Sequence, residues 1–161
     1  MSITLNGSLG AVYQPDIMQL ANVVDEDQIA NASTTLAAIP QLDLNVAAYE
    51  RVLLRYTIFY KTVAAADIKY QVDVPASPTQ YRQFSEGFAP DDTAFDLALA
   101  SAEGSVSLLG AANTEGFLRV TALLENGANA GTVSFKFAQV TSDASDTTVY
   151  AGSFLEYRRF G

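Results

Sequence analysis

Residues 68–74 read Ile68-Lys69-Tyr70-Gln71-Val72-Asp73-Val74, an unbroken alternation of apolar and polar side chains. Successive side chains of a β-strand point to opposite faces, so this period of two predicts a strand with one buried and one wet face. Pro75 and Pro78 follow directly, and proline ends a strand because it lacks the backbone N–H that pairs with a neighbour. The segment therefore predicts a half-buried strand of an antiparallel sheet.

A longer alternation precedes it, from Tyr49 to Tyr60. Arg51 and Arg55 mark the wetter of its two faces, because charged side chains stay in water. The other face is predicted to point into the core, and its members are Val52, Leu54, Tyr56, Ile58 and Tyr60. This segment predicts a second strand, buried on one side.

Shorter segments of the same kind recur along the rest of the chain, at residues 33–36, 42–46, 80–86, 95–99, 116–124, 133–137 and 151–160. Turn residues such as Asn126-Gly127 separate them, and no convincing helical pattern lies between them. About eight strands at this spacing are typical of an antiparallel sandwich or barrel and not of βαβ units.

Residues 1–30 differ from the remainder. They contain the acidic triplet Asp25-Glu26-Asp27 and only scattered apolar residues. A short helix is compatible with Ile17–Ala30, because several of its apolar residues fall near one helical face. We interpret residues 1–30 as an N-terminal arm or lead-in and residues 31–161 as the β-sandwich. An ordinary first strand is the alternative for this segment.

The last strand carries apolar residues on both of its faces. Leu155 and Tyr157 share one side, whereas Phe154 lies on the other with Glu156 and Arg158. This pattern is expected when one face of a strand meets the core and the other meets a neighbouring subunit. A poorly patterned edge strand is the alternative interpretation.

The composition excludes several classes of functional site and partner. The 161 residues include no His, no Cys and no Trp, so zinc sites of the Cys/His kind, cysteine nucleophiles and Ser-His-Asp triads are excluded. The net charge of −9 predicts repulsion from phosphate backbones and no nucleic-acid partner. No apolar run approaches the roughly 20 residues that span a bilayer, so we expect no membrane partner. The length fits one domain.

Carboxylates are the remaining candidates for chemistry. Asp91-Asp92 follows a proline, and Asp143 and Asp146 lie in the segment 141–148, which is predicted to be a loop. Glycoside hydrolysis needs two facing carboxyls roughly 5 to 10 Å apart. Calcium needs six to eight oxygens, which Asp25–Asp27 or Asp143–Asp146 would have to supply without the spacing of an EF-hand. We expect solvated turn carboxylates instead, with no catalytic residue, no metal site and no cofactor.

Aromatic residues offer one further class of site. Tyr49, Tyr81, Phe84 and Phe88 lie near predicted loops or on mixed strands, and they are the candidates for an exposed sugar-binding platform. Most of the seventeen Tyr and Phe residues sit at alternating strand positions, where they more often fill a core or an interface.

Four blocks resemble a family of small jelly-roll virion proteins of tailed bacteriophages. Two are residues 27–36 with Pro40 and Leu42, and residues 49–60 leading into 67–70 and Pro75. The more specific two are GTVSFKFAQVTSDA at 131–144 and TVYAGSFLEYRR at 148–159. The blocks cover residues 27–161, and the family contains capsid decoration (cement) proteins and related tail-fibre domains.

The resemblance implies an all-β, antiparallel, jelly-roll-like β-sandwich with an N-terminal arm, assembled as a homotrimer. It implies a non-enzymatic decoration protein, made in the host cytoplasm and located on the capsid surface of the virion, whose partners are the major capsid protein and itself. No long repetitive shaft is evident, which favours this role over the alternative, a tail or fibre module that binds a receptor or glycan.

Two groups of contact residues follow from this interpretation. The first is a capsid-contact set in the arm: Val12, Tyr13, Ile17 and Leu20. The second is a trimer interface on the last strand: Phe154, Tyr157 and Phe160.

Overall fold

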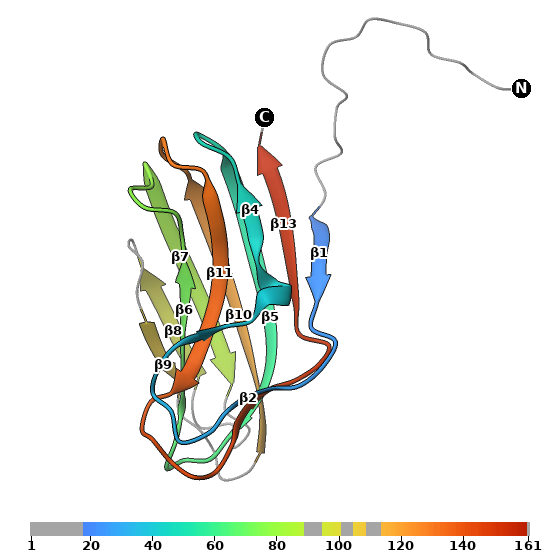
Figure 1. Cartoon of the computed structure of the whole chain (residues 1–161), viewed down its shortest axis with the longest axis vertical. Coiled ribbons are helices and arrows are strands. Elements are labelled where there is room, and N and C mark those ends of the chain that lie inside the picture. The colour runs from blue at the N-terminus through green and yellow to red at the C-terminus, as the bar shows by residue number, and fades with distance from the viewer. Residues whose placement is uncertain (1–17, 89–94, 101–104, 109–113, 161) are drawn as a thin grey trace, which may run out of the picture.

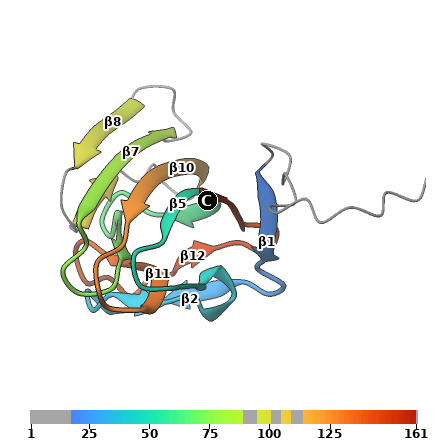
Figure 2. The ribbon, with the colours of Figure 1, turned by 90° about the horizontal axis from the view of Figure 1, so that it is seen from above.

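The computed structural model describes residues 18–88, 95–100, 105–108 and 114–160, and it consists of two antiparallel β-sheets packed face to face (Figures 1 and 2). The prediction of an all-β antiparallel sandwich is confirmed. Apart from the single 3-10 turn η1 (Pro40–Leu42), the described residues contain no helix. Thirteen strands are described, against the eight or so expected, because several short pairing segments carry no visible alternation.

The large sheet contains eight strands: β1 (Gln19–Val23), β2 (Gln28–Ala30), β5 (Arg51–Thr62), β7 (Gln80–Phe88), β8 (Phe95–Ala100), β10 (Thr114–Glu125), β12 (Thr147–Val149) and β13 (Phe154–Phe160). Six of them follow the order β1-β13-β5-β10-β7-β8, and β2 and β12 extend the sheet beside β5. The two longest strands, β5 and β10, pair along their whole length from Thr62↔Thr114 to Arg51↔Glu125. They form the centre of the sheet.

The small sheet contains five strands: β3 (Ala37–Ala38), β4 (Leu44–Val46), β6 (Ile68–Asp73), β9 (Ser105–Leu108) and β11 (Gly131–Gln139). Its main path is β3-β11-β6-β9, and β4 pairs with the start of β11. The alternation that predicted β6 is confirmed, since Ile68, Tyr70 and Val72 are buried and the residues between them are half-buried.

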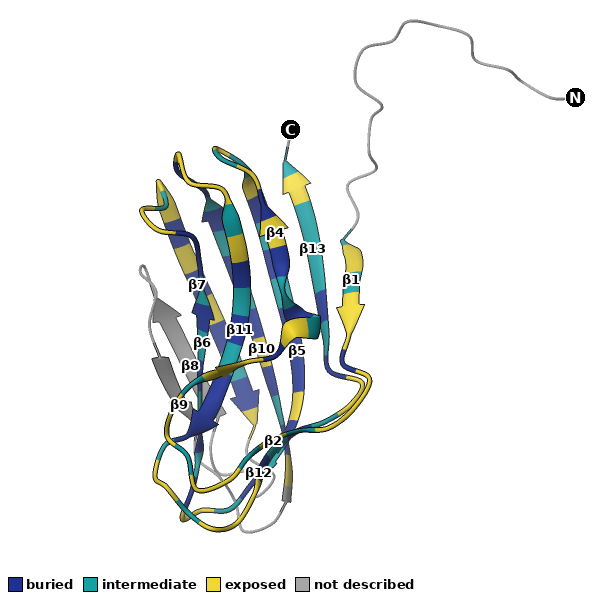
Figure 3. Cartoon of the chain, viewed as in Figure 1, coloured by how far each residue is buried: buried dark blue, intermediate teal, exposed yellow. Residues whose placement is uncertain are grey.

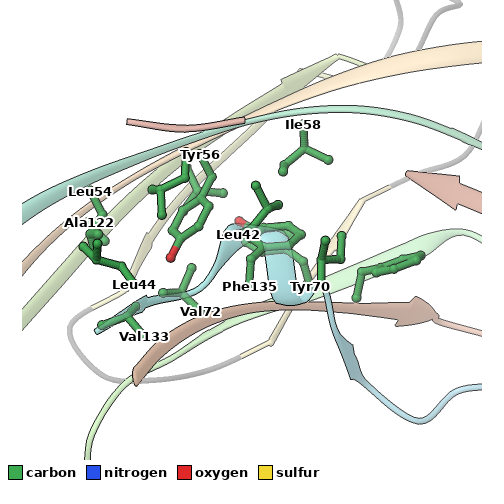
Figure 4. Packing of buried hydrophobic residues seen from close by; sticks show 14 of the residues in the cluster. Leu42, Leu44, Leu54, Tyr56, Ile58, Tyr70, Val72, Ala122, Val133 and Phe135 are labelled. Carbon is green, nitrogen blue, oxygen red and sulfur yellow. The ribbon is translucent and has the colours of Figure 1, made fainter. Parts of the chain in front are cut away.

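The core lies between the two sheets and uses the alternation of both. Val52, Leu54, Tyr56, Ile58 and Tyr60 of β5 are all buried, as predicted, and face β11 and β6. At the centre the Phe135 ring stacks on Tyr70 at 5.7 Å between centroids and meets Tyr56 at 5.3 Å (Figure 4). Tilted and offset ring pairs of this kind add to the burial energy of the rings themselves.

The helix considered for Ile17–Ala30 is wrong, because the described part of this segment forms β1 and β2. β1 pairs with the final strand β13, and β2 pairs with β12. Val24, between β1 and β2, is buried in the core and donates its N–H to the carbonyl of Ser153. The alternative of an ordinary first strand therefore describes residues 19–30 better than a separate arm, because pairing with the C-terminal strands satisfies their backbone groups.

Two more local predictions are corrected. Residues 33–36 form no strand, and the segment 141–148, predicted to be a loop, contains the start of β12. Both outcomes depend on buried polar side chains. The Gln139 side chain accepts the N–H groups of Ser33 and Asp143, and the hydroxyl groups of Thr62 and Thr147 hydrogen-bond at 2.7 Å inside the sheet. Such contacts join residues far apart in the chain, so local alternation does not reveal them.

Candidate interaction surface

A row of phenylalanines crosses the surface of the large sheet that points away from the small sheet, which we call the outer face. Phe59 of β5 lies opposite Phe117 of β10, which lies opposite Phe88 of β7. The Phe59 and Phe117 rings are 6.0 Å apart and tilted by 49°. Phe59 is 40% exposed and Phe88 is 48% exposed.

The outer face gathers nearly all the exposed apolar bulk of the described residues. In all, the described residues include seven exposed large hydrophobic side chains: Leu20, Val23, Ile29, Tyr49, Phe59, Phe84 and Phe88. Residues directly opposite in an antiparallel pair share a face, so the registers place all of them except Tyr49 on the outer face. Isolated exposed hydrophobics are ordinary, but a single face that contains most of them is a candidate interaction surface.

Ion pairs lie between the apolar positions of this face. Three arginines each meet a glutamate on a neighbouring strand: Arg119–Glu86 at 3.0 Å, Arg51–Glu125 at 3.2 Å and Arg55–Glu156 at 3.6 Å. Arg119 also lies over the Phe117 ring, and Arg158 lies over the Phe160 ring 4.8 Å from its centroid. The rings and the charged groups therefore form one mixed surface, in which each of these three arginines is paired within the chain.

The charge of the outer face is opposite in sign to that of the whole chain. Six basic residues, Arg51, Arg55, Lys61, Arg82, Arg119 and Arg158, share it with four acidic residues, Glu86, Glu115, Glu125 and Glu156. Elsewhere the described residues include three basic and ten acidic residues. A chain with a net charge of −9 thus presents a weakly basic, aromatic face.

The outer face of the small sheet has no such character. Lys69, Gln71 and Asp73 of β6 and Ser134 and Lys136 of β11 point away from the core and are half-buried. The Lys136 ammonium forms an ion pair with the Asp73 carboxylate across these two strands. This is the polar surface expected of a sheet that faces water.

The residues predicted for the arm contact fall in two groups. Val12, Tyr13 and Ile17 lie outside the described residues. Leu20 lies on β1 opposite Glu156, so it belongs to the outer face, and it is 61% exposed. Most of β1 is exposed (Figure 3). The neighbours of Leu20 across the sheet are Glu156 of β13 and Arg55 of β5, which separate it from the phenylalanine row.

The residues predicted for the trimer interface do not share one face. Phe154 and Phe160 belong to the outer face, opposite Thr57 and Arg51 of β5. Tyr157 lies opposite Leu54, on the inner side, where it packs against the core with the Arg159 guanidinium 5.3 Å from its ring centroid. The alternation of β13 separates them, so a partner on the outer face would meet the two phenylalanines and not the tyrosine.

The predicted sugar platform is divided in the same way. Phe84 and Phe88 lie on the outer face, but Tyr81 is buried, which contradicts its proposed exposure. The Tyr81 hydroxyl donates to the Gln83 side chain at 2.5 Å. Tyr49 lies at the far end of the sandwich, 75% exposed and held at φ +61°, a backbone conformation that bulky residues rarely adopt.

The two candidate carboxylates that the structure describes, Asp143 and Asp146, have structural partners. Asp143 accepts the Ser145 N–H at 2.8 Å, and Asp146 accepts the Asn31 amide at 2.7 Å. The hydrogen bonds from Ser145 lower the pKa of Asp143, whereas a general acid needs a raised pKa. Asp91 and Asp92 lie outside the described residues. Within the described ranges, no three His, Cys, Asp or Glu residues gather as a metal site would require.

Sequence reasoning placed Phe59 on the wetter face of its strand, but it singled out neither Phe59 nor Phe117 as a contact residue. A signal was present, because β5 and β10 carry large apolar residues on both faces, as the last strand does: Leu53 and Phe59 on β5, and Phe117 and Leu123 on β10. Phe59 and Phe117 lie in one row because of the strand order and the register, which the sequence does not show.

The chain has no significant match to any family model, curated protein or solved structure. None of the described elements is a helix of the length and hydropathy that crossing a membrane requires. The interaction surface therefore has to be interpreted from its own chemistry.

Proposed function

We propose that this chain is a non-enzymatic structural protein of a tailed-phage virion: a jelly-roll-like capsid decoration (cement) protein that binds the assembled head as a homotrimer. The observation that carries the proposal is the outer face, where a sandwich of this size exposes six large apolar side chains together. A protein that acts by contact needs such a surface, and it needs no catalytic group. The sequence blocks at 131–144 and 148–159 supply the link to phage virions.

Decoration stabilises a shell by mass action. A protein that binds only the assembled shell shifts the equilibrium away from expanded or dissociated states, and three linked copies multiply weak contacts by avidity. The protein would be made in the host cytoplasm and act on the capsid surface, with the major capsid protein as its partner.

Copy number per particle tests this function. Quantitative mass spectrometry of purified virions, referenced to the major capsid protein, should find hundreds of copies of the chain. A handful of copies would move the chain to the tail and favour the alternative function, and its absence from virions would overturn the proposal.

The part of the arm outside the described residues is tested by removing residues 1–17. This truncation leaves every described strand in place, whereas removal of residues 1–30 would delete β1, β2 and the buried Val24. If the arm grips the shell, the truncated protein folds with an unchanged circular dichroism spectrum but no longer sediments with shells that lack the wild-type protein. Normal shell binding would remove Val12, Tyr13 and Ile17 from the proposal.

The second candidate is a tail or fibre module that binds a receptor or glycan. It is favoured by Tyr49, whose ring is held out at the end of the sandwich in a strained backbone conformation. A glycan array with the purified chain distinguishes the two functions. Binding to host polysaccharide that Tyr49→Asn abolishes would support the module, because asparagine tolerates the positive φ and only the ring is lost.

A further inference from the structure

We propose that the outer face of the large sheet is covered by other copies of this chain. In this arrangement the β13–β5 half of one face contacts the β10–β7 half of the next about a common axis. The inference takes from the proposed function only the expectation of an oligomer, and it assigns to that oligomer a surface centred on Phe59, Phe117 and Phe88. The central strands thereby replace Tyr157 of the last strand as the predicted contact.

The apolar part of the surface fits a protein partner. Phe59, Phe84 and Phe88 are exposed, and Phe117, Phe154 and Phe160 are half-buried on the same face. Interface centres are rich in aromatic side chains and arginine, which supply large contact areas from few rotatable bonds. Burying this face removes most of the exposed large hydrophobics of the described residues in one step.

Three arginines on the outer face already form ion pairs within the chain. Arg51, Arg55 and Arg119 each already have a glutamate partner in the same chain. A charge that loses water without a partner is costly, whereas a charge that is already paired loses much less on contact. The face can therefore lose solvent without leaving these three guanidinium groups uncompensated.

The overall charge selects this face for contact between copies. Two chains of net charge −9 repel one another, and the repulsion is greatest where acidic surfaces meet. Away from the outer face, the described residues include ten acidic and three basic residues. Contact through the outer faces joins the weakly basic surfaces and keeps the acidic remainders of the copies apart.

The charge on the face is also unevenly divided. The β13–β5 half carries Arg51, Arg55, Lys61 and Arg158 against Glu156 alone, whereas the β10–β7 half carries Arg82 and Arg119 against Glu86, Glu115 and Glu125. The two halves are thus complementary to one another. Head-to-tail contact of unlike halves closes into a ring under cyclic symmetry, which agrees with a trimer.

Sedimentation equilibrium on the full chain tests the inference. We expect a mass close to three times 17.2 kDa at micromolar concentration. The double variant Phe59→Ser/Phe88→Ser should raise the dissociation constant by roughly 100-fold or more, because both aromatic anchors are lost. Tyr49→Asn is the matched control, since Tyr49 is the exposed large apolar residue that lies off this face, and it should leave the mass unchanged.

A charge reversal provides a second test that spares the rings. Lys61→Glu lowers the positive charge of the β13–β5 half and should weaken association by about 3- to 10-fold. Lys69→Glu makes the same change on the outer face of the small sheet and should have no effect on association. Thermal unfolding of each variant at equal concentration confirms that the chains are folded.

The outcomes separate the inference from the proposed function. A wild-type chain that stays at the mass of one copy, or a Lys69→Glu variant that dissociates as readily as Lys61→Glu, overturns the inference. Wild-type monomers that nevertheless bind shells in hundreds of copies would leave the decoration function standing without it. A trimer that depends on Phe59 and Phe88 but is missing from virions would leave the inference standing and overturn the decoration function.

Discussion

Strand β5 separates two groups of aromatic rings that have opposite roles. On its inner side, Tyr56 meets Phe135, which stacks on Tyr70, and all three side chains are buried. On its outer side, Phe59 meets Phe117 in the row that leads to Phe88, with the rings partly exposed. The two ring pairs have similar spacing, so ring contact alone does not distinguish them.

The two groups differ in whether each ring is covered on both of its sides or on one side only. The inner rings are enclosed between the two sheets, so their removal leaves a cavity in the core. The outer rings have the sheet on one side and solvent on the other, so the fold gains little from them. Aromatic residues that the fold does not need but the chain retains on one surface point to a contact with another molecule.

The largest predicted effect is on the inner group. Phe135→Ala should lower the free energy of unfolding by about 3–5 kcal/mol, because a buried ring in contact with Tyr56 and Tyr70 is replaced by a cavity. Urea denaturation followed by circular dichroism measures it. Phe84→Ala on the outer face is the control and should cost less than about 1 kcal/mol. Equal losses at the two positions would remove the distinction between the groups.

The next effect appears at high pH. Burial, followed by the nearby Tyr81 and Asp43, raises the pKa of Tyr56 well above its usual value of about 10. The unfolded chain then releases this proton at a lower pH than the folded chain does. The contribution of the neutral Tyr56 hydroxyl to stability is complete below the pKa that this group has in the unfolded chain. Above that pKa, the free energy of unfolding falls by up to about 1.4 kcal/mol per pH unit.

Tyr56→Phe should therefore move the midpoint of alkaline unfolding to higher pH. The Tyr56 hydroxyl has no hydrogen-bond partner among the described residues, so its loss at pH 7 should be neutral or stabilising by up to about 1 kcal/mol. Tyr49→Phe at the exposed end of the sandwich is the matched control. An unchanged alkaline midpoint in the Tyr56 variant would show that another group governs the transition.

A smaller effect is expected within the outer group. Phe59→Ala should cost at most about 1.5 kcal/mol of unfolding free energy, since the ring loses one tilted contact with Phe117 and leaves no enclosed cavity. The measurement requires a protein concentration at which the mass is that of one chain, because association adds its own stabilisation. A loss as large as that of Phe135→Ala would mean that the outer row belongs to the fold.

The smallest effect concerns ion pairs on the two outer faces. Arg119→Gln on the large sheet and Lys136→Gln on the small sheet should each cost about 1 kcal/mol or less, because the groups are partly exposed and screened by water. Their effects on association should differ. Sedimentation should detect weaker association for the Arg119 variant and wild-type association for the Lys136 variant.

The long strands were predictable because their alternation is local. Residues 51–62 and 68–73 bury every second side chain as expected, since the pleat imposes that period. The short strands β2, β3 and β12 were not predictable. Each spans only two or three residues, and their partners are distant in the chain, as in Ala30↔Thr147 and Phe137↔Ala37.

The candidate surface was predictable only in fragments. Leu20, Phe84, Phe88, Phe154 and Phe160 were each singled out from sequence, for three different roles. No pattern in the sequence joined them, because they lie on three strands, β1, β13 and β7, whose order in the sheet differs from their order in the chain. Tyr81 and Tyr157, which were grouped with them, lie on the inner side of their strands, and Tyr81 is buried.

The sequence by itself determined the strand-rich class, the two-sided character of the long strands, the absence of His and Cys chemistry, and the net charge. Composition and local periodicity are properties of the chain, so they need no fold to be read. The tertiary structure alone decided that six exposed apolar residues and six of the nine basic residues share one face. Pairing register brings distant strands together, and no local pattern encodes which strands will be neighbours.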